Sequence, residues 1–184
     1  MGCCRERRAD DGDRVRGLAL VRRRFGDSMF TNLLKSILHN IGVVTVGFGV
    51  AWIGTLIDAL FGVGEFHGTV ASVAGGLLLA IGFLLRAWAT FHFYMHRMRV
   101  ISLTPQTALI TTGPYRFSRN PLYLGGNVFI FFGAALLFGS PAALVLTALH
   151  LSLMDRFVRR EEAQLERTFG ADWLRYKAQV RRWI

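Results

Sequence analysis

The sequence predicts an all-α, polytopic integral membrane protein with about four transmembrane helices, a C-terminal helical hairpin and a cytoplasmic amphipathic helix. Three observations predict it. Apolar residues, 52% of the 184 residues, gather in long blocks. The basic residues that give the net charge of +10 lie beside the ends of those blocks. The last part of the chain is polar and amphipathic. A chain of this length has room for one domain.

The apolar blocks have the length that a membrane requires. About 17–25 apolar residues, wound as a helix, cross the hydrocarbon core of a bilayer. A soluble all-α core would need a polar face on each helix, and these blocks have almost none. The third and fourth blocks are separated only by Gly139-Ser140-Pro141 and therefore form a tight hairpin. The four blocks are Ile41–Phe61, Val70–Leu85, Leu122–Phe138 and Ala142–Met154.

The positions of the basic residues predict the topology and exclude nucleic-acid binding. Arginines lie in the N-terminal tail, between Arg97 and Arg119, and after Met154, whereas the connections Gly62–Thr69 and Gly139–Pro141 carry no Lys or Arg. Basic segments stay in the cytoplasm, so we expect a multi-pass protein of the inner or cell membrane with both termini cytoplasmic. Membrane lipids, and no nucleic acid, are the expected surroundings.

The N-terminal segment reads as a separate tail. Residues 1–28 are rich in arginine and acidic residues and poor in large apolar ones, which predicts a disordered basic tail ahead of a single domain at 29–184. The only cysteines, Cys3 and Cys4, are neighbours, so a disulfide framework is excluded.

Two polar motifs lie on either side of the hairpin. The first is Gly113-Pro114-Tyr115-Arg116, followed by Arg119-Asn120-Pro121-Leu122-Tyr123-Leu124-Gly125. The second begins at Glu161-Glu162 and continues through Leu165, Phe169-Gly170, Trp173 and Tyr176. With these motifs at this separation, residues 105–184 resemble the membrane methyltransferase superfamily that contains isoprenylcysteine carboxyl methyltransferases and phospholipid N-methyltransferases. Asn120 stands where prenylcysteine enzymes generally have histidine, and Trp173 stands where the family usually has tyrosine.

The resemblance implies a helical, non-Rossmann methyltransferase that binds S-adenosyl-L-methionine on its cytoplasmic side, with an acceptor that enters laterally from the bilayer. The chemistry of that cofactor agrees, because its carboxylate, ribose and sulfonium need basic or amide, acidic and aromatic partners. The residues that we expect to bind it are Tyr115, Arg119, Asn120, Pro121, Tyr123, Gly125, Glu161 and Glu162.

The expected reaction is O-methylation of the carboxylate of a lipophilic, isoprenylcysteine-like acceptor. Such a carboxylate is ionised at pH 7 and needs no general base. Arg86 and Arg160 are the candidates to pair with it. For an amine acceptor, Glu161 or Glu162 would accept a proton instead, and we place Glu162 among the catalytic candidates.

Alternatives stay open at this stage. The motifs are also compatible with N- or S-methylation of a phospholipid amine or a small lipophile. A non-enzymatic membrane protein could retain the same fold. Arg86 either snorkels to the interface or faces an internal polar cavity. His92 and His96 have the i, i+4 spacing of metal ligands, but no third ligand lies nearby in sequence, so no metal site is expected.

Overall fold

The computed structural model describes the backbone of residues 3–95 and 108–184, and the side chains of these residues other than 3–29 and 32. In this part of the chain every element is helical and there is no strand. This confirms the predicted all-α class. The elements in order are α1 (Cys3–Phe61), α2 (Thr69–Met95), η1 (Gly113–Arg116, a 3-10 turn), α3 (Pro121–Tyr123), η2 (Leu124–Ile130, a π-helix), α4 (Phe131–Phe138), α5 (Pro141–Phe169) and α6 (Ala171–Gln179).

Four stretches of the described chain are long and apolar enough to cross a membrane: Leu33–Phe61, Thr69–Met95, Pro121–Phe138 and Pro141–Phe169. They contain the four predicted blocks, and the third is assembled from α3, η2 and α4. Large apolar side chains such as Trp52, Val70 and Leu77 are exposed on the outside of the bundle. Lipid would cover them in a bilayer, which suits a multi-pass membrane protein.

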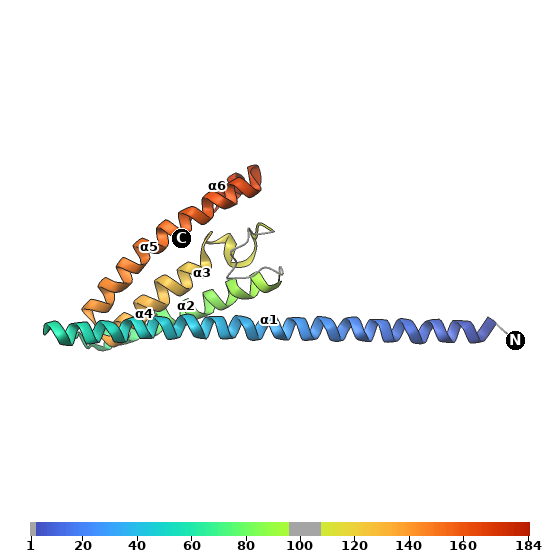
Figure 1. Cartoon of the computed structure of the whole chain (residues 1–184), viewed down its shortest axis with the longest axis horizontal. Coiled ribbons are helices and arrows are strands. Elements are labelled where there is room, and N and C mark those ends of the chain that lie inside the picture. Colours follow the sequence, from blue (N-terminus) through green and yellow to red (C-terminus); the bar gives the residue numbers. More distant parts are fainter. Residues whose placement is uncertain (1–2, 96–107) are drawn as a thin grey trace.

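The two short connections meet at one end of the bundle. The Phe66 amide donates a hydrogen bond to the Gly139 carbonyl, with 2.7 Å between nitrogen and oxygen. η1 and α6 lie at the opposite end, where α5 has diverged from α1 (Figure 1). The four described spans, an even number, place both ends of the membrane-spanning region on the same side of the membrane, as the distribution of charge predicts. The cytoplasmic placement of the end with η1 and α6 remains a prediction.

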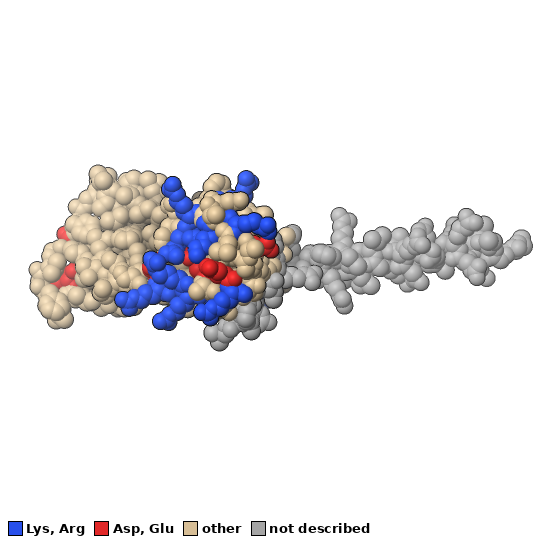
Figure 2. Space-filling view, turned by 90° about the horizontal axis from the view of Figure 1, so that it is seen from above, with Lys and Arg blue, Asp and Glu red and all other residues tan. Residues whose placement is uncertain are grey.

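Basic side chains mark that end. Figure 2 shows that Lys and Arg gather on one end of the described chain, around a small group of acidic side chains. The exposed members include Arg116, Arg156, Arg160, Arg167, Arg175 and Lys177. A surface of this kind is expected beside anionic lipid headgroups.

Gly82 and Gly125 let α2 approach η2 closely. A Cβ atom at Gly82 would lie 2.6 Å from the Gly125 carbonyl oxygen, and one at Gly125 would lie 2.7 Å from that of Gly82. Small residues at such crossings allow membrane helices to make tight backbone contacts. This contact fixes the third span against the second, and it thereby positions Leu122 and Tyr123 directly before η2.

α1 begins at Cys3 and therefore runs through residues 3–28, which the sequence predicts as a disordered tail. The membrane-spanning part of α1 starts only at Leu33, so the tail precedes the span. The separation of a tail from a domain at 29–184 stays a prediction.

Candidate functional site

A pocket lies at the basic end of the bundle, where the two sequence motifs meet. Residues from the end of α2, from η1, α3, α5 and α6, and from the segments between them line it. They are Phe93, Leu109, Ile110, Tyr115, Arg119, Asn120, Pro121, Leu122, Tyr123, Glu161, Glu162, Leu165, Trp173 and Tyr176. Its volume is about 50 Å³, so it holds a few water molecules in this conformation.

The aromatic side of the pocket is built by α6 packing on η1. The Tyr176 hydroxyl donates a hydrogen bond to the Tyr115 carbonyl oxygen at 2.7 Å, and Trp173 is fully buried beside it. Both belong to an apolar cluster with Phe93 and Leu122. Gly113, with a φ of 60°, makes the turn that leads into η1. Burial raises the pKa of the Tyr115 and Tyr176 phenols well above the usual range, so both remain neutral hydrogen-bonding groups.

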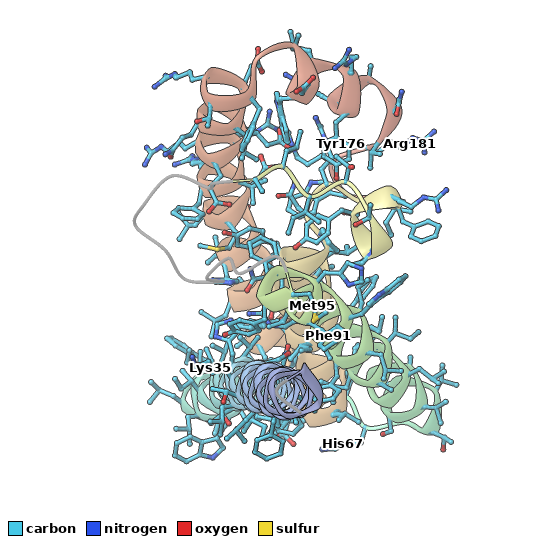
Figure 3. All side chains as sticks on the ribbon, turned by 90° about the vertical axis from the view of Figure 1, so that its right-hand side faces the viewer. Lys35, His67, Phe91, Met95, Tyr176 and Arg181 are labelled. Atoms are coloured by element: carbon cyan, nitrogen blue, oxygen red, sulfur yellow. The ribbon has the colours of Figure 1, made fainter. Side chains whose placement is uncertain are left out.

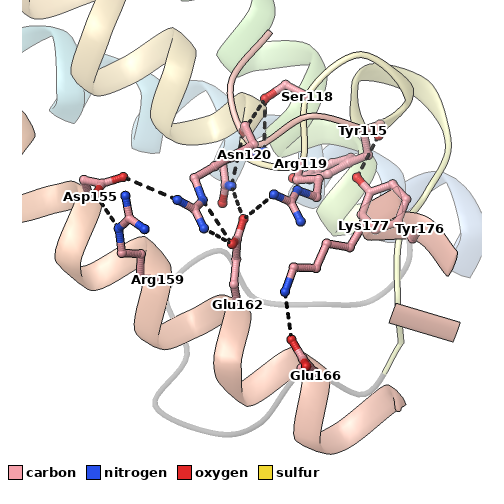
Figure 4. Close-up of polar contacts among 11 residues, drawn as sticks. Tyr115, Ser118, Arg119, Asn120, Asp155, Arg159, Glu162, Glu166, Tyr176 and Lys177 are labelled. Atoms are coloured by element: carbon pink, nitrogen blue, oxygen red, sulfur yellow. Dashed lines mark hydrogen bonds and ion pairs between the residues drawn. The ribbon is translucent and has the colours of Figure 1, made fainter. Parts of the chain in front are cut away.

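Glu162 is the centre of the polar side (Figure 4). Its carboxylate is buried and accepts a hydrogen bond from Asn120 Nδ2 at 3.2 Å. Two guanidinium groups pair with it, Arg119 at 3.6 Å and Arg182 at 2.7 Å. A buried carboxylate is tolerated only with such partners. The Arg119-Asn120 motif and the Glu161-Glu162 motif are therefore joined directly through Glu162.

Glu161 faces a different partner. The Tyr123 hydroxyl donates a hydrogen bond to Glu161 Oε2 at 2.9 Å, which ties α3 to α5 one residue before Glu162. The two neighbouring carboxylates thus have different surroundings. Glu162 is compensated by two cations, whereas Glu161 has a neutral phenol.

The C-terminal segment packs on the residues directly before α3. The Arg119 amide donates to the Arg181 carbonyl oxygen at 3.0 Å, and both Ser118 Oγ and Asn120 Nδ2 donate to the Arg182 carbonyl oxygen, at 3.1 and 3.3 Å. Figure 3 places Tyr176 and Arg181 on the side of the molecule away from Lys35 of α1. The last residues therefore cover the site, on the side opposite α1.

Several buried polar atoms of the pocket have no hydrogen-bond partner. They are the Tyr115 hydroxyl, Nε and Nη1 of Arg119 and Nε1 of Trp173. Buried donors are rarely left unpaired, so water or a ligand is expected to complete them. Together they offer donors for a carboxylate or for adenine and ribose, and the aromatic rings offer faces for a sulfonium cation. The donor set fits S-adenosylmethionine, although the pocket must widen to admit it.

Seven of the eight predicted cofactor-binding residues line the pocket, namely Tyr115, Arg119, Asn120, Pro121, Tyr123, Glu161 and Glu162. Gly125 does not, because it packs against Gly82 and Arg86 of α2. Arg160 is exposed on α5 and does not line the pocket. Of the predicted catalytic residues, only Glu162 lies in the wall.

Arg86 does not take the interfacial position, one of the two that the sequence left open. It is buried, so it does not snorkel to the interface. Its Nη1 donates to the Leu122 carbonyl oxygen at 2.7 Å, and its Nη2 lies 2.7 Å from His39 Nε2 of α1. Arg86 therefore sits behind the pocket wall and joins the first three spans. A Cβ atom at Gly126 would meet its guanidinium at 2.6 Å, so that glycine makes room for it.

Four participants were not among the residues expected from the sequence. Trp173 and Tyr176 belong to the second motif but were not expected to bind the cofactor. Ser118 and Arg182 carried no signal, since neither belongs to a periodic pattern. His96 lies outside the described residues. Within the described part of the chain, no group of three or more His, Cys, Asp or Glu side chains could hold a metal ion.

Comparison with known proteins gives one finding. A family model described as phospholipid methyltransferase matches residues 70–172, more than half of the chain. The matched region begins in α2 and ends just before Trp173, so it contains both motifs that meet at Glu162. No curated protein and no solved structure matches the chain.

Proposed function

The chain belongs to the phospholipid methyltransferase family, and from this premise we propose that it is an S-adenosylmethionine-dependent enzyme that O-methylates the carboxylate of a lipophilic acceptor. The acceptor is an isoprenylcysteine-like amphiphile, and the reaction takes place at the cytoplasmic face of the cell membrane. Family membership supports methyl transfer in a membrane. The state of the two pocket carboxylates supports the choice of acceptor.

The observation that carries the choice is that both carboxylates already have hydrogen-bond or ion-pair partners in the pocket. Glu162 is held by Arg119 and Arg182, and Glu161 accepts a hydrogen bond from Tyr123. An alkylamine acceptor has a pKa of roughly 10, as lysine does, and must lose a proton before it can be methylated. A carboxylate acceptor arrives ionised and needs no base. The pocket is therefore better suited to an acid than to an amine.

S-adenosylmethionine, when bound, supplies an electrophilic methyl group. The unpartnered donors of Arg119 and Trp173 would hold its carboxylate or adenine, and Glu161 and Glu162 would hold its hydroxyl or amino groups. Tyr115, Trp173 and Tyr176 provide the aromatic wall. The residues thus bind and orient the reactants and exclude water, the contributions that a displacement at carbon needs most.

A second candidate is N-methylation of a phospholipid amine. The description of the matching family favours it, and so does Glu161, whose only described partner is the neutral Tyr123 hydroxyl. Glu161 would then accept the proton of the amine. This reaction differs from the first in the chemical stability of its product.

Methyl transfer from labelled S-adenosylmethionine to a membrane-lipid extract tests both. After incubation with the purified full-length protein, the lipid product is treated with alkali. A methyl ester releases labelled methanol, as we expect, whereas an N-methyl amine keeps its label and would support the second candidate. Absence of any lipid label with folded protein would overturn the proposed function.

Matched variants connect this activity to the pocket. Arg119→Ala should abolish transfer, because Arg119 contacts Glu162 and contributes two of the unpartnered donors. Arg116→Ala should retain it, because Arg116 lies three residues earlier, is exposed and does not line the pocket. Equal activity in the two variants would remove Arg119 from the site.

A further inference from the structure

A second cavity, which we call the α5 groove, lies between η2 and α5. Leu124, Val128 and Leu151 line one end of it, all within the membrane-spanning stretches. Its volume is about 690 Å³, far larger than that of the pocket and within the roughly 300–1,000 Å³ of small-molecule sites. The groove therefore has an apolar end, at the depth of the bilayer, with room for a lipid chain.

The other end of the groove is charged. Asp155, Arg156 and Arg159 of α5 line it, and Arg159 Nε donates to Asp155 Oδ2 at 2.6 Å. Arg156 is exposed, and its side chain has no ion pair or hydrogen bond to any described residue. One cation thus remains uncompensated where the groove reaches the basic surface. This polarity matches an amphiphile with an apolar chain and a single anionic end.

The charged end of the groove adjoins the cofactor pocket. Arg182 lies between the two, 3.9 Å from Asp155 in the groove and 2.7 Å from Glu162 in the pocket wall. The next residue, Trp183, lines the groove. Arg159 precedes Glu162 by three residues on α5, a rise of about 4.5 Å along the helix. Arg182 and Trp183 therefore form a thin partition between groove and pocket.

We propose that the α5 groove is the binding site of the lipophilic acceptor, a long-chain or isoprenoid carboxylic acid. Its chain lies along Leu124, Val128 and Leu151, and its carboxylate lies against Arg156 and Arg159. This proposal rests on the proposed O-methyltransferase function. To reach the pocket, the acceptor carboxylate replaces Asp155 as a partner of Arg182. The partition moves with this change, while Arg182 keeps its stronger contact with Glu162.

Fluorescence quenching of Trp183 tests the groove without requiring turnover. The full chain in lipid nanodiscs is titrated with a long-chain carboxylic acid that carries bromine atoms on its chain, and with the methyl ester of the same acid. We expect the acid to quench tryptophan fluorescence with higher affinity than the ester. Trp183→Phe should remove the quenching that the acid shows beyond the ester, because Trp52 and Trp88, which the bilayer-dissolved chains of both compounds also reach, do not line the groove.

Arginine variants then locate the carboxylate. Arg156→Ala should weaken binding of the acid about fivefold and leave the ester unchanged, the size expected for one basic residue near a membrane surface. Arg167→Ala is the matched control, an exposed arginine on α5 that lines neither cavity. Acid-specific quenching that persists in Trp183→Phe, or equal affinity for acid and ester, would overturn the proposal.

The two experiments distinguish a wrong assignment of the groove from a wrong assignment of the function. Wild-type protein that binds the acid at Trp183 but forms no methyl ester would refute the function and leave the groove as a lipid site. Protein that forms methyl esters without quenching of Trp183 would refute the groove and leave the function.

Discussion

The Arg182 guanidinium holds one oxygen of the Glu162 carboxylate with two hydrogen bonds, from Nε at 3.0 Å and from Nη2 at 2.7 Å. The other oxygen, Oε1, faces Asn120 and Arg119. Charge-assisted contacts of this kind are stronger than neutral hydrogen bonds. Glu162 therefore connects the C-terminus to the segment before the third span.

Arg182→Ala should lower stability. It leaves the buried Glu162 with Arg119 and Asn120 alone, and the expected loss is about 1–3 kcal/mol, seen as a lower midpoint of thermal unfolding in detergent. Hydrogen bonding to Glu162 raises the pKa of Arg182, so on the alkaline side this contribution is lost only as the pH rises through the range in which arginine loses its proton. Arg181→Ala is the control, because its exposed side chain has no described partner and only its carbonyl is used. An unchanged midpoint for Arg182→Ala would contradict the stabilising role.

Glu162→Gln should weaken binding of S-adenosylhomocysteine by about 1–3 kcal/mol, the range for a lost charge-assisted hydrogen bond. Calorimetric titration of the solubilised protein measures it. Glu166→Gln should have little effect, since Glu166 lies outside the pocket and its pair with Lys177 is partly exposed. If Glu162→Gln is folded and binds as tightly as wild type, Glu162 does not take part in cofactor binding.

Glu161→Gln tests the second carboxylate separately. The Tyr123 hydroxyl can still donate to the amide oxygen, so the fold should persist while the negative charge is lost. We expect weaker binding of S-adenosylhomocysteine by a similar amount, again by calorimetry. Under the amine alternative the same variant would lose turnover by more than it loses affinity, which distinguishes a proton acceptor from a binding group.

Reporter fusions test the topology. A reporter after Ile184 should read cytoplasmic, as should one inserted between Tyr94 and Pro105. One near Glu65 should read non-cytoplasmic, because residues 62–68 and 139–141 meet at the end without Lys or Arg. A non-cytoplasmic reading at Ile184 would refute four crossings with cytoplasmic termini.

Deletion of residues 1–28 tests the tail. The span begins at Leu33 and the pocket residues all lie after α1, so a chain that starts at Met29 should fold and bind S-adenosylhomocysteine as the full chain does. The thermal midpoint and the affinity are the measurements. A large loss of either would show that the tail is part of the domain.

Much of the fold could be predicted because spans are a matter of length and hydropathy. The blocks at 41–61 and 70–85 lie inside the first two spans, and the Gly139-Ser140-Pro141 turn lies between the last two. The two motifs were expected at one site, and the individual contacts within it, Glu161 with Tyr123 and Glu162 with Asn120, come from the structure.

The rest depends on tertiary contacts that leave no periodic pattern. The π-helix at Leu124–Ile130 reads in sequence as an ordinary apolar helix. In the sequence, Arg86 is compatible with an interfacial arginine. Its partners, His39 and the Leu122 carbonyl, belong to two other spans and meet it only in the folded chain. Arg182 stands in a basic tail, and only the fold reveals that it pairs with Glu162.

The buried Asp58 sets an order for biosynthesis. It accepts hydrogen bonds from the Ser140 hydroxyl and from the Ala142 amide, more than eighty residues further along the chain. When the first span leaves the ribosome, neither partner has been translated, and an unpaired carboxylate is costly inside a bilayer. The nascent first span must therefore keep Asp58 at the aqueous surface until the last hairpin inserts. The bundle becomes locked only after Ser140 and Ala142 have been translated, and it is locked at the end remote from the pocket.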